Sequence, residues 1–373
     1  MNITINRAEL LNAARRMAAV APSSSPLEIL RGVLLETDAG TGKLTLTATN
    51  LEVSLEEKLP CSAADDDALV VGAQLLAAML EKLPEDTVQI TRQGEQSVVS
   101  LKSGCACYAV PVWARSSFPK PELPFPEDTV KVSGIPTMAR HTVFAASVEN
   151  EKPLLKCVNL MFTKTGLRAA GSDGHCIVTA KGDEKSVGNV SLLVPASSLE
   201  KLARMSRDKD EFRVGTTGKS IVFFRENFLF SARLMEGGYI NTDQLMASIQ
   251  NSFTVLTDVP DLKNALHSVL SVGADGKVSL QFDGGLLTFH CEGEGVNAVA
   301  SVAVIALTGA PMGEYWYSAR KLTACLRALS GTVTLGIAQN GMLTLSTQDA
   351  FYMQSAMRPS VKAEQKKSPA KAA

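Results

Sequence analysis

The sequence predicts an α+β protein made of three tandem copies of one domain, each with two helices packed on antiparallel sheets. Similar segments recur about 123 positions apart. Lys43–Leu51 recurs as Gly166–Gly174, and an amphipathic run recurs after Gly72, Pro195 and Tyr317. Self-similarity at a fixed period is typical of one structural unit used repeatedly, and a unit of this length can have its own core.

Two linkers are expected between the repeats. Phe118–Asp128 has four prolines in eleven residues, and Ala247–Ser252 is a short polar stretch. We therefore expect domains at residues 1–125, 126–250 and 251–359. The composition of residues 360–373, rich in Lys and Ala without an apolar anchor, is typical of a disordered basic tail.

Each repeat is expected to begin with an amphipathic helix. In the first repeat, Asn6 followed by Glu9 three residues later has the form of a capping box. In the third repeat, Asp258 is placed to cap the helix, and Pro260 suits its first turn. The first helix of the second repeat is expected over Ile135–Ser147.

A strand hairpin is expected after each opening helix. Gly32–Thr37 and Lys43–Asn50 flank a turn, and Val158–Thr163 and Leu167–Ala170 repeat this arrangement. The segment Gly215–Ser220 ends like a phosphate-binding loop, but only two residues separate its glycines where four are needed. It also lies between two strand-like runs, so we interpret it as a hairpin turn.

The second helix of each repeat is expected to carry basic side chains on the face directed away from the core. In the second repeat these are Lys201, Arg204 and Arg207. From one helix alone, an ordinary solvated face would be the better interpretation. The recurrence of cations at equivalent positions favours a shared basic surface, although the net charge is +3 for the tail and −4 for the rest of the chain. An acidic body does not indicate tight binding of nucleic acid by bulk charge.

Catalytic and metal sites are not expected. Asp173, His175 and Cys176 lie close in sequence, but adjacent residues of an extended segment point to opposite sides. The four histidines have no metal-ligand spacing, and the seven scattered cysteines indicate reduced thiols. With no signal-peptide pattern and no apolar run of about 18 residues, the sequence predicts a cytoplasmic protein without a membrane segment, catalytic residues, metal or cofactor.

The chain resembles the bacterial DNA polymerase III β subunit, the β sliding clamp, as a divergent member. The matching phrases are Leu27–Glu36, Leu46–Leu55, Phe144–Val158, Ser172–His175, Phe230–Tyr239 and Ala356–Arg358. Their order and spacing agree with the threefold repeat.

The resemblance implies a processivity factor rather than an enzyme. Two crescent-shaped subunits would join head to tail into a six-domain ring that encircles double-stranded DNA without reading its sequence. The implied partners are the polymerase III catalytic subunit, the clamp loader and repair proteins, all bound through short peptides in a hydrophobic pocket.

The resemblance also assigns site residues. For the partner-peptide pocket they are Leu155, Ser172, Gly174, His175, Cys176, Ile177, Tyr317, Val333, Leu335, Met353, Ala356, Met357 and Arg358. With the helix faces considered, the DNA-facing candidates are Arg15, Arg16, Lys82, Arg140, Lys152, Lys201, Arg204, Arg207, Lys263, Arg320, Lys321 and Arg327. The dimer-interface candidates are Leu75, Met79, Tyr108 and Val110, facing a third-repeat surface near His267–Val272 and the strand before Gly293.

The chain departs from the family pattern at Cys176, Ile240, Gln244 and Ala356. These departures predict a peptide preference that differs from the common one. Two alternatives stay open at this point. One is an enzyme or small-molecule binding protein on the same repeated fold. The other is a clamp-like scaffold, accessory or encoded by a mobile element, with altered partners or without DNA encirclement.

Overall fold

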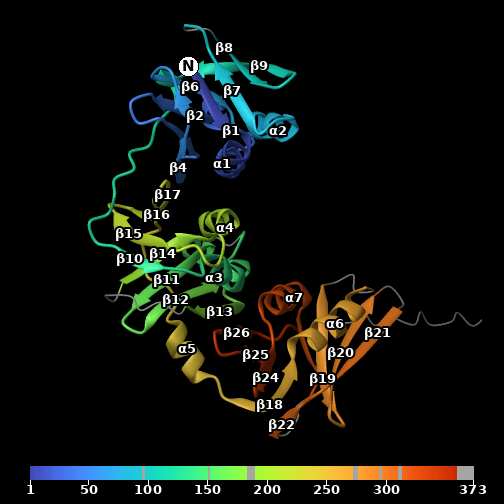
Figure 1. Cartoon of the computed structure of the whole chain (residues 1–373). Helices are drawn as coiled ribbons and strands as arrows, with labels where there is room; N and C mark the ends of the chain where they lie inside the picture. Colours follow the sequence, from blue (N-terminus) through green and yellow to red (C-terminus); the bar gives the residue numbers. More distant parts are fainter. Residues whose placement is uncertain are drawn as a thin grey trace, which may run out of the picture. The chain divides into compact units, whose positions relative to one another are not determined.

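The computed structural model describes residues 1–94, 97–149, 152–182, 190–271, 276–293, 296–309 and 313–358 (Figure 1). The tail expected at 360–373 lies outside these residues. The chain divides into two compact units. Unit 1 comprises Met1–Ala169 and Lys181–Tyr239, and unit 2 comprises Ala170–Ala180 and the chain from Ile240 onward.

Seven α-helices occur in the described residues, and six of them form pairs. The pairs are α1 with α2, α3 with α4, and α6 with α7 (Figure 1). The helices are α1 (Arg7–Val20), α2 (Ala73–Lys82), α3 (Ile135–Thr142), α4 (Ala196–Met205), α5 (Thr242–Ser248), α6 (Val259–Leu270) and α7 (Ala319–Ala328). The predicted α+β class with three repeated helix pairs is confirmed.

Unit 1 is built around one antiparallel sheet of thirteen strands. Its order is β10-β15-β16-β17-β4-β3-β2-β6-β9-β8-β7-β1-β5. These strands are β1 (Asn2–Asn6), β2 (Gly32–Asp38), β3 (Lys43–Thr49), β4 (Val53–Pro60), β5 (Ser62–Ala63), β6 (Asp67–Gly72), β7 (Thr87–Thr91), β8 (Val98–Ser103), β9 (Ala106–Ala114), β10 (Val130–Val132), β15 (Phe212–Thr217), β16 (Ser220–Arg225) and β17 (Phe228–Arg233). Strand β17 pairs with β4, so the first two repeats share a sheet.

Two further strands of unit 1, β11 (Cys157–Thr163) and β14 (Val190–Pro195), pair antiparallel. Strand β12 (Gly166–Ser172) follows β11 and leads the chain from unit 1 into unit 2. Unit 2 has one run of strands in the order β13-β26-β25-β24-β18-β22 and a separate four-stranded sheet, β21-β20-β19-β23. These are β13 (Cys176–Lys181), β18 (Asn251–Asp258), β19 (Lys277–Asp283), β20 (Leu286–Gly293), β21 (Val296–Ala303), β22 (Ala306–Gly309), β23 (Tyr315–Ser318), β24 (Thr332–Ala338), β25 (Leu343–Ser346) and β26 (Ala350–Gln354).

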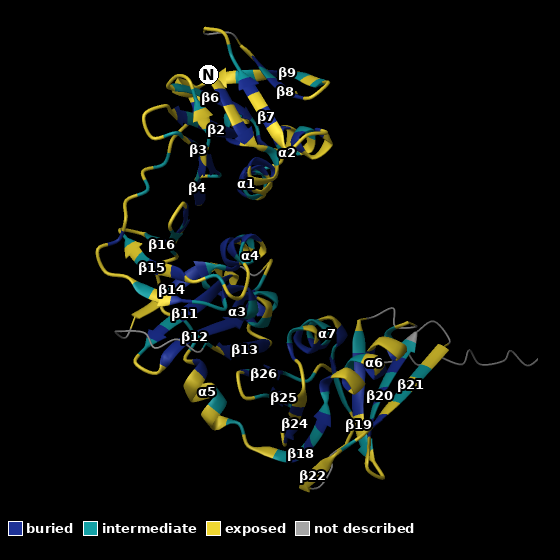
Figure 2. Ribbon diagram, in the orientation of Figure 1, coloured by how far each residue is buried: buried dark blue, intermediate teal, exposed yellow. Residues whose placement is uncertain are grey.

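Helix α1 forms as the sequence predicts. The Asn6 side chain accepts a hydrogen bond from the Glu9 N–H at 3.1 Å, which satisfies one backbone donor of the first turn. The expected apolar stripe is fully buried against the sheet (Figure 2). Its members are Leu10, Ala13, Ala14, Met17 and Val20. By contrast, α5 and β22 are largely exposed.

Two helix expectations need correction. Asp258 occupies the N-cap position of α6, but its carboxylate accepts from the Thr332 hydroxyl at 3.0 Å instead of capping the helix. Helix α3 ends at Thr142 rather than Ser147. The Thr142 hydroxyl donates to the Met138 carbonyl at 2.8 Å, and the chain then tightens into a 3₁₀ turn over Val143–Ala145.

The segment Gly215–Ser220 and the turn between Gly32–Thr37 and Lys43–Asn50 are hairpin turns, as expected. Thr217 ends β15 and Ser220 begins β16, with Gly218 at φ 55° between them. Gly42, at φ 64°, occupies the turn between β2 and β3. Such left-handed positions favour glycine. No helix among the described residues is both long and apolar enough to span a membrane.

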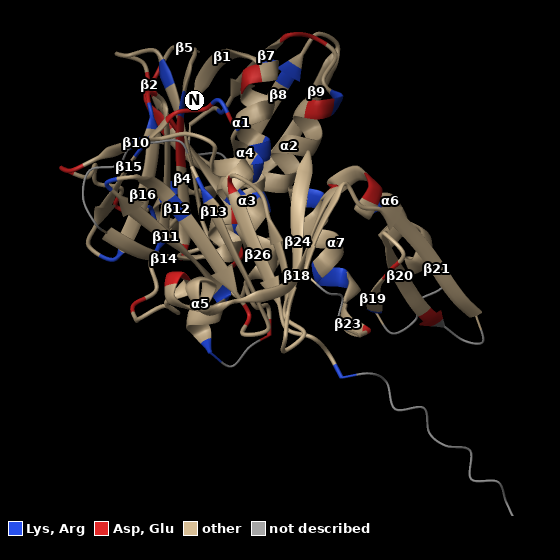
Figure 3. Ribbon diagram, turned by 90° about the horizontal axis from the view of Figure 1, so that it is seen from below, with Lys and Arg blue, Asp and Glu red and all other residues tan. Residues whose placement is uncertain are grey.

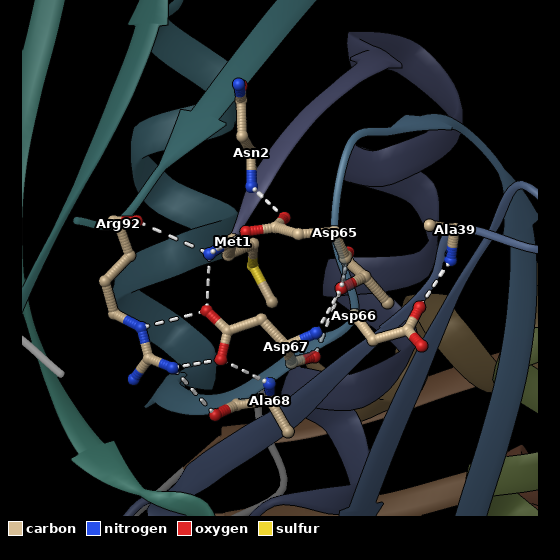
Figure 4. A network of polar contacts seen from close by, with 9 residues as sticks. Met1, Asn2, Ala39, Asp65, Asp66, Asp67, Ala68 and Arg92 are labelled. Carbon is tan, nitrogen blue, oxygen red and sulfur yellow. Dashed lines mark hydrogen bonds and ion pairs between the residues drawn. The ribbon is translucent and has the colours of Figure 1, made fainter. Parts of the chain in front are cut away.

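The Met1 amine lies in a network of ion pairs beside β6 (Figure 4). It donates to Asp67 Oδ2 at 2.5 Å, and Arg92 donates to both oxygens of the same carboxylate. Burial acts to raise the pKa of Asp67, but the hydrogen bonds from Met1 and Arg92 outweigh it and hold that pKa below its ordinary value. The network ties the first strand to β6 and to the chain after β7.

Candidate functional site

A tight turn between β12 and β13 forms the centre of the candidate site in unit 2. The Ser172 hydroxyl donates to the Cys176 carbonyl at 2.9 Å and accepts from the Gly174 N–H at 3.0 Å. Asp173 Oδ1 accepts from the N–H groups of His175 and Cys176, both at 2.9 Å. Gly174 has φ 92°, a conformation that side-chain-bearing residues rarely adopt. The sequence S-D-G-H therefore supplies the residues that this turn requires.

The C-terminal strand brings distant residues to this turn. In the β13–β26 pairing, Ile177 lies opposite Met353 and Cys176 lies opposite Gln354. Beyond the strand, the Ser355 N–H donates to the His175 carbonyl at 2.9 Å. Met357 then pairs with Trp316, whose carbonyl accepts the Met357 N–H at 2.7 Å. Segments more than 170 positions apart thus lie side by side within unit 2.

Only part of the expected peptide pocket is accessible. Gly174, His175, Met357 and Arg358 are exposed, and Ala356 is half-buried. The remaining unit 2 candidates are buried in the core, beneath these accessible residues. These are Ser172, Cys176, Ile177, Tyr317, Val333, Leu335 and Met353. Leu155 belongs to unit 1, where it is buried in a 3₁₀ turn.

A cavity of about 410 Å³ in unit 2 adjoins Met353. Its walls come from α5, the start of β18 and the β24–β25 turn. Leu245, Ile249 and Met342 supply apolar surface there, and sequence reasoning did not select them. The missed signal was Asn241, whose side chain caps α5 by accepting from the Gln244 N–H at 3.1 Å. Polar side chains make up most of the rest of the lining, namely Ser248, Gln250, Asn251, Ser252, Gln339 and Asn340, so the cavity is of mixed polarity.

The thiol of Cys176 in this region is buried. Burial first, and the charge of Asp173 second, raise the pKa of Cys176 to about 12. Burial also raises the pKa of Cys325 and Tyr352, which lie in the same electrostatic neighbourhood. No group of three or more potential metal-ligating side chains occurs among the described residues.

Most cations predicted to face DNA are tied to partners within their own unit. Figure 3 marks the Lys and Arg residues of the described chain in blue. Lys201 of α4 donates to the Ala19 carbonyl at 2.6 Å near the end of α1. Lys263 of α6 donates in the same way to the Leu329 carbonyl at the end of α7, at 3.0 Å. A cation at a helix C-terminus also interacts favourably with the helix dipole. These two lysines therefore join neighbouring helices.

Other candidate cations form ion pairs. Arg15 pairs with Glu81, Arg16 with Glu57, Arg140 with Asp208, Arg204 with Glu200, and Lys321 with Asp173. Five further candidates are exposed, as are Arg15, Arg140 and Arg204, and one of the five, Lys152, lies at the N-cap of a 3₁₀ turn. The other four are Lys82, Arg320 and Arg327 on helices, and Arg207 just after the end of α4. Ion pairs therefore balance the charge of five of the twelve candidates.

The expected dimer residues differ in exposure. The Leu75 side chain is 46% exposed, Met79 and Tyr108 are half-buried, and Val110 is buried. In unit 2, β21 is the edge strand of the four-stranded sheet, and its Val296 is 51% exposed. Edge strands with apolar side chains are typical sites of pairing with another chain.

Two family models match the chain. The model of the DNA polymerase III beta subunit N-terminal domain matches residues 1–124, and that of the central domain matches residues 129–241. A beta sliding clamp from Synechococcus elongatus is 26% identical over 346 residues, which cover 89% of this chain and 91% of that protein. The Bacillus subtilis beta sliding clamp is 24% identical over 295 residues, covering 74% of this chain and 76% of the relative.

Solved structures show the same fold over almost the whole chain. The Bacillus subtilis sliding clamp superposes with a TM-score of 0.85 at 18% identity, covering 96% of this chain and 99% of that one. A Pseudomonas aeruginosa sliding clamp bound to griselimycin gives a TM-score of 0.86 at 22% identity, covering 96% and 100%. The similarity therefore includes the third repeat.

Proposed function

The chain belongs to the DNA polymerase III beta subunit family, and from that premise we propose that it is a sliding clamp. Such a protein is a non-catalytic processivity factor of the cytoplasm that encircles duplex DNA. It tethers the polymerase III catalytic subunit, the clamp loader and repair proteins. Its hold on DNA is topological, so neither a sequence-reading surface nor a catalytic group is required.

The observation that carries the proposal is the recurrence of a helix pair with outward basic side chains in all three repeats. Phosphate groups attract such a face, and each neutralised phosphate adds to the salt dependence of binding. The ion pairs of Arg16, Arg140, Arg204 and Lys321 limit that attraction. A face whose charge is balanced in part suits sliding better than tight fixed binding.

The proposed partner site is the surface formed by the Ser172–Cys176 turn, the end of β26 and the adjoining cavity. A short peptide would place apolar anchors against Met357 and into the cavity beside Met353. His175 and Arg358 supply polar groups at its edge. Peptide sites commonly combine a few apolar anchors with such polar groups. Departures from the family at Ile240 and Gln244 lie in or next to α5, and we expect them to alter peptide preference.

Ring closure requires two copies of the chain. We assign β21 as the third-repeat side of a head-to-tail contact, because it is an edge strand with exposed valines. Leu75, Met79 and Tyr108 are the first-repeat candidates for the opposite side. A head-to-tail contact closes into a ring when the rotation between copies allows it.

Solution mass tests this part of the proposal. Light scattering at micromolar concentration should give twice the chain mass of 39.6 kDa. The change Val299→Lys, at a β21 residue that is 63% exposed, should give a folded monomer. The matched control Val148→Lys, at a unit 1 valine that is 78% exposed, should remain a dimer. A monomeric wild-type chain would contradict ring formation and favour the scaffold alternative.

A further inference from the structure

The ammonium group of Lys321 in α7 is tied to the carboxylate of Asp173 in the β12–β13 turn. The side chains of Lys321 and Asp173 are 23% and 18% exposed. Sequence periodicity placed Lys321 on the basic helix face, next to Arg320. We propose that Lys321 is instead a positioning residue of the partner site, which fixes the turn that presents His175. This inference rests on the proposed peptide-binding function.

Asp173 accepts hydrogen bonds at both of its carboxylate oxygens. Its Oδ1 accepts two backbone N–H groups, from His175 and Cys176, while its Oδ2 accepts from Lys321. A carboxylate engaged at both oxygens cannot rotate without breaking charge-assisted hydrogen bonds. Lys321 therefore fixes the orientation in which Asp173 holds the two N–H groups of the turn.

Backbone contacts connect the turn to the accessible residues of the partner site. The His175 carbonyl, at the end of the turn, accepts from the Ser355 N–H, and Ser355 directly follows β26. Two residues later, Met357 is paired with Trp316, just before α7. The turn, the C-terminal segment and α7 thus form a closed loop of contacts within unit 2. A shift of the turn would change the positions of both His175 and the segment that carries Met357.

Hydrogen bonds stabilise the negative charge of Asp173. Burial raises the pKa of its carboxyl group, but hydrogen bonds from Lys321, Cys176 and His175 outweigh burial and lower the pKa overall. The same negative charge contributes to the raised pKa of the buried Cys176 thiol, and the charge of Lys321 opposes it. Without Lys321, this largely buried carboxylate beside a buried thiol would lose the cation that donates to its Oδ2. Such a charge is costly, and the turn would open to hydrate it.

Arg320 provides the matched control. It is the neighbouring cation on α7, and it is exposed, so it can reach solvent or phosphate groups. A general effect of positive charge on α7 would be lost equally in Arg320→Met and Lys321→Met. A positioning role predicts an effect of Lys321→Met alone, with recovery in Lys321→Arg, which can still donate to Asp173.

The first measurement needs no peptide. Hydrogen exchange of the His175 and Cys176 amides should be about tenfold faster in Lys321→Met than in wild type, which corresponds to about 1.4 kcal/mol of lost protection. The rate should change little in Lys321→Arg and Arg320→Met. Thermal unfolding shows whether each variant is folded. Unchanged exchange in folded Lys321→Met would overturn the proposal.

The second measurement uses a fluorescein-labelled peptide, the tightest binder among overlapping peptides from the host's polymerase III catalytic subunit. We expect Lys321→Met to weaken its binding about tenfold. Asp173→Asn should weaken it as well, and the double variant should be no worse than the single ones. Equal loss in Arg320→Met would overturn the positioning role. If wild type binds no peptide, the proposed partner site is wrong, whereas the exchange result still decides whether Lys321 holds the turn.

Discussion

Arg16 of α1 donates two hydrogen bonds to the carboxylate of Glu57 in β4, from Nε at 2.8 Å and from an Nη at 2.5 Å. The Arg16 side chain is 25% exposed and that of Glu57 is 10% exposed. Arg16 was expected to face DNA, but this two-point contact directs its guanidinium to the sheet of its own unit. A cation held in this way stabilises the helix–sheet contact and contributes less to phosphate binding.

The first prediction compares Arg16 with its neighbour. Arg16→Met should lower the free energy of unfolding by about 1–3 kcal/mol, because it leaves a largely buried carboxylate without its partner. Arg15→Met should cost less than about 1 kcal/mol, because Arg15 and Glu81 are both more than half exposed. Urea unfolding of the two variants measures the difference. Equal stability would show that the Arg16–Glu57 contact contributes nothing.

The second prediction concerns Asp67 and its two cationic partners (Figure 4). At pH 7, Asp67→Asn should destabilise the chain by about 1–2 kcal/mol, since the pair is mostly but not fully buried. The folded-state pKa of Asp67 lies below its ordinary value of 3.8. Its stabilisation is therefore present above pH 3.8 and lost as the pH falls through the lower folded-state pKa.

Unfolding of wild type and Asp67→Asn between pH 2 and 7 tests this sign. The two proteins should converge at the acid end of the range. A stability difference that grows on acidification would contradict the assignment.

The third prediction concerns thiol reactivity. Cys105 and Cys107 are exposed, whereas Cys157, Cys176, Cys291 and Cys325 are buried. At pH 8, a maleimide should label Cys105 and Cys107 rapidly, because the reactive species is an accessible thiolate. Cys176, whose pKa is raised to about 12, should label only after unfolding. Peptide mass mapping gives the order, and early labelling of Cys176 would show that its strand opens readily.

The fourth prediction concerns the partner surface. Met357→Ala should weaken peptide binding by about 1–3 kcal/mol, or roughly ten- to a hundredfold, while leaving the dimer intact. Met357 is a better test than Met353, which is 7% exposed and whose truncation would disturb the core. Met235→Ala in unit 1 is the matched control, because Met235 is 37% exposed and Met357 is 38% exposed. Fluorescence anisotropy with the polymerase peptide measures both, and equal affinities would place the partner site elsewhere.

The repeat and the buried helix stripes could be predicted from the sequence, because periodic apolar residues reflect the faces that must leave water. The partners of long side chains could not. Periodicity put Lys201 and Lys321 on outer helix faces, yet Lys201 donates to Ala19, 182 positions away, and Lys321 donates to Asp173, 148 positions away. A flexible lysine reaches whichever acceptor the tertiary structure supplies. Helix α5 was missed because its end, Ala247–Ser248, falls in the polar stretch Ala247–Ser252, which suggested a linker.

The central claim, a clamp held on DNA by topology, is tested most directly on circular DNA. The protein would be loaded with its host's clamp loader onto nicked circular plasmid and isolated by gel filtration in high salt, which suppresses phosphate contacts. We predict that it stays on the circle and leaves within minutes when a restriction enzyme linearises the DNA. Dissociation from the intact circle at the rate seen with linear DNA would contradict encirclement.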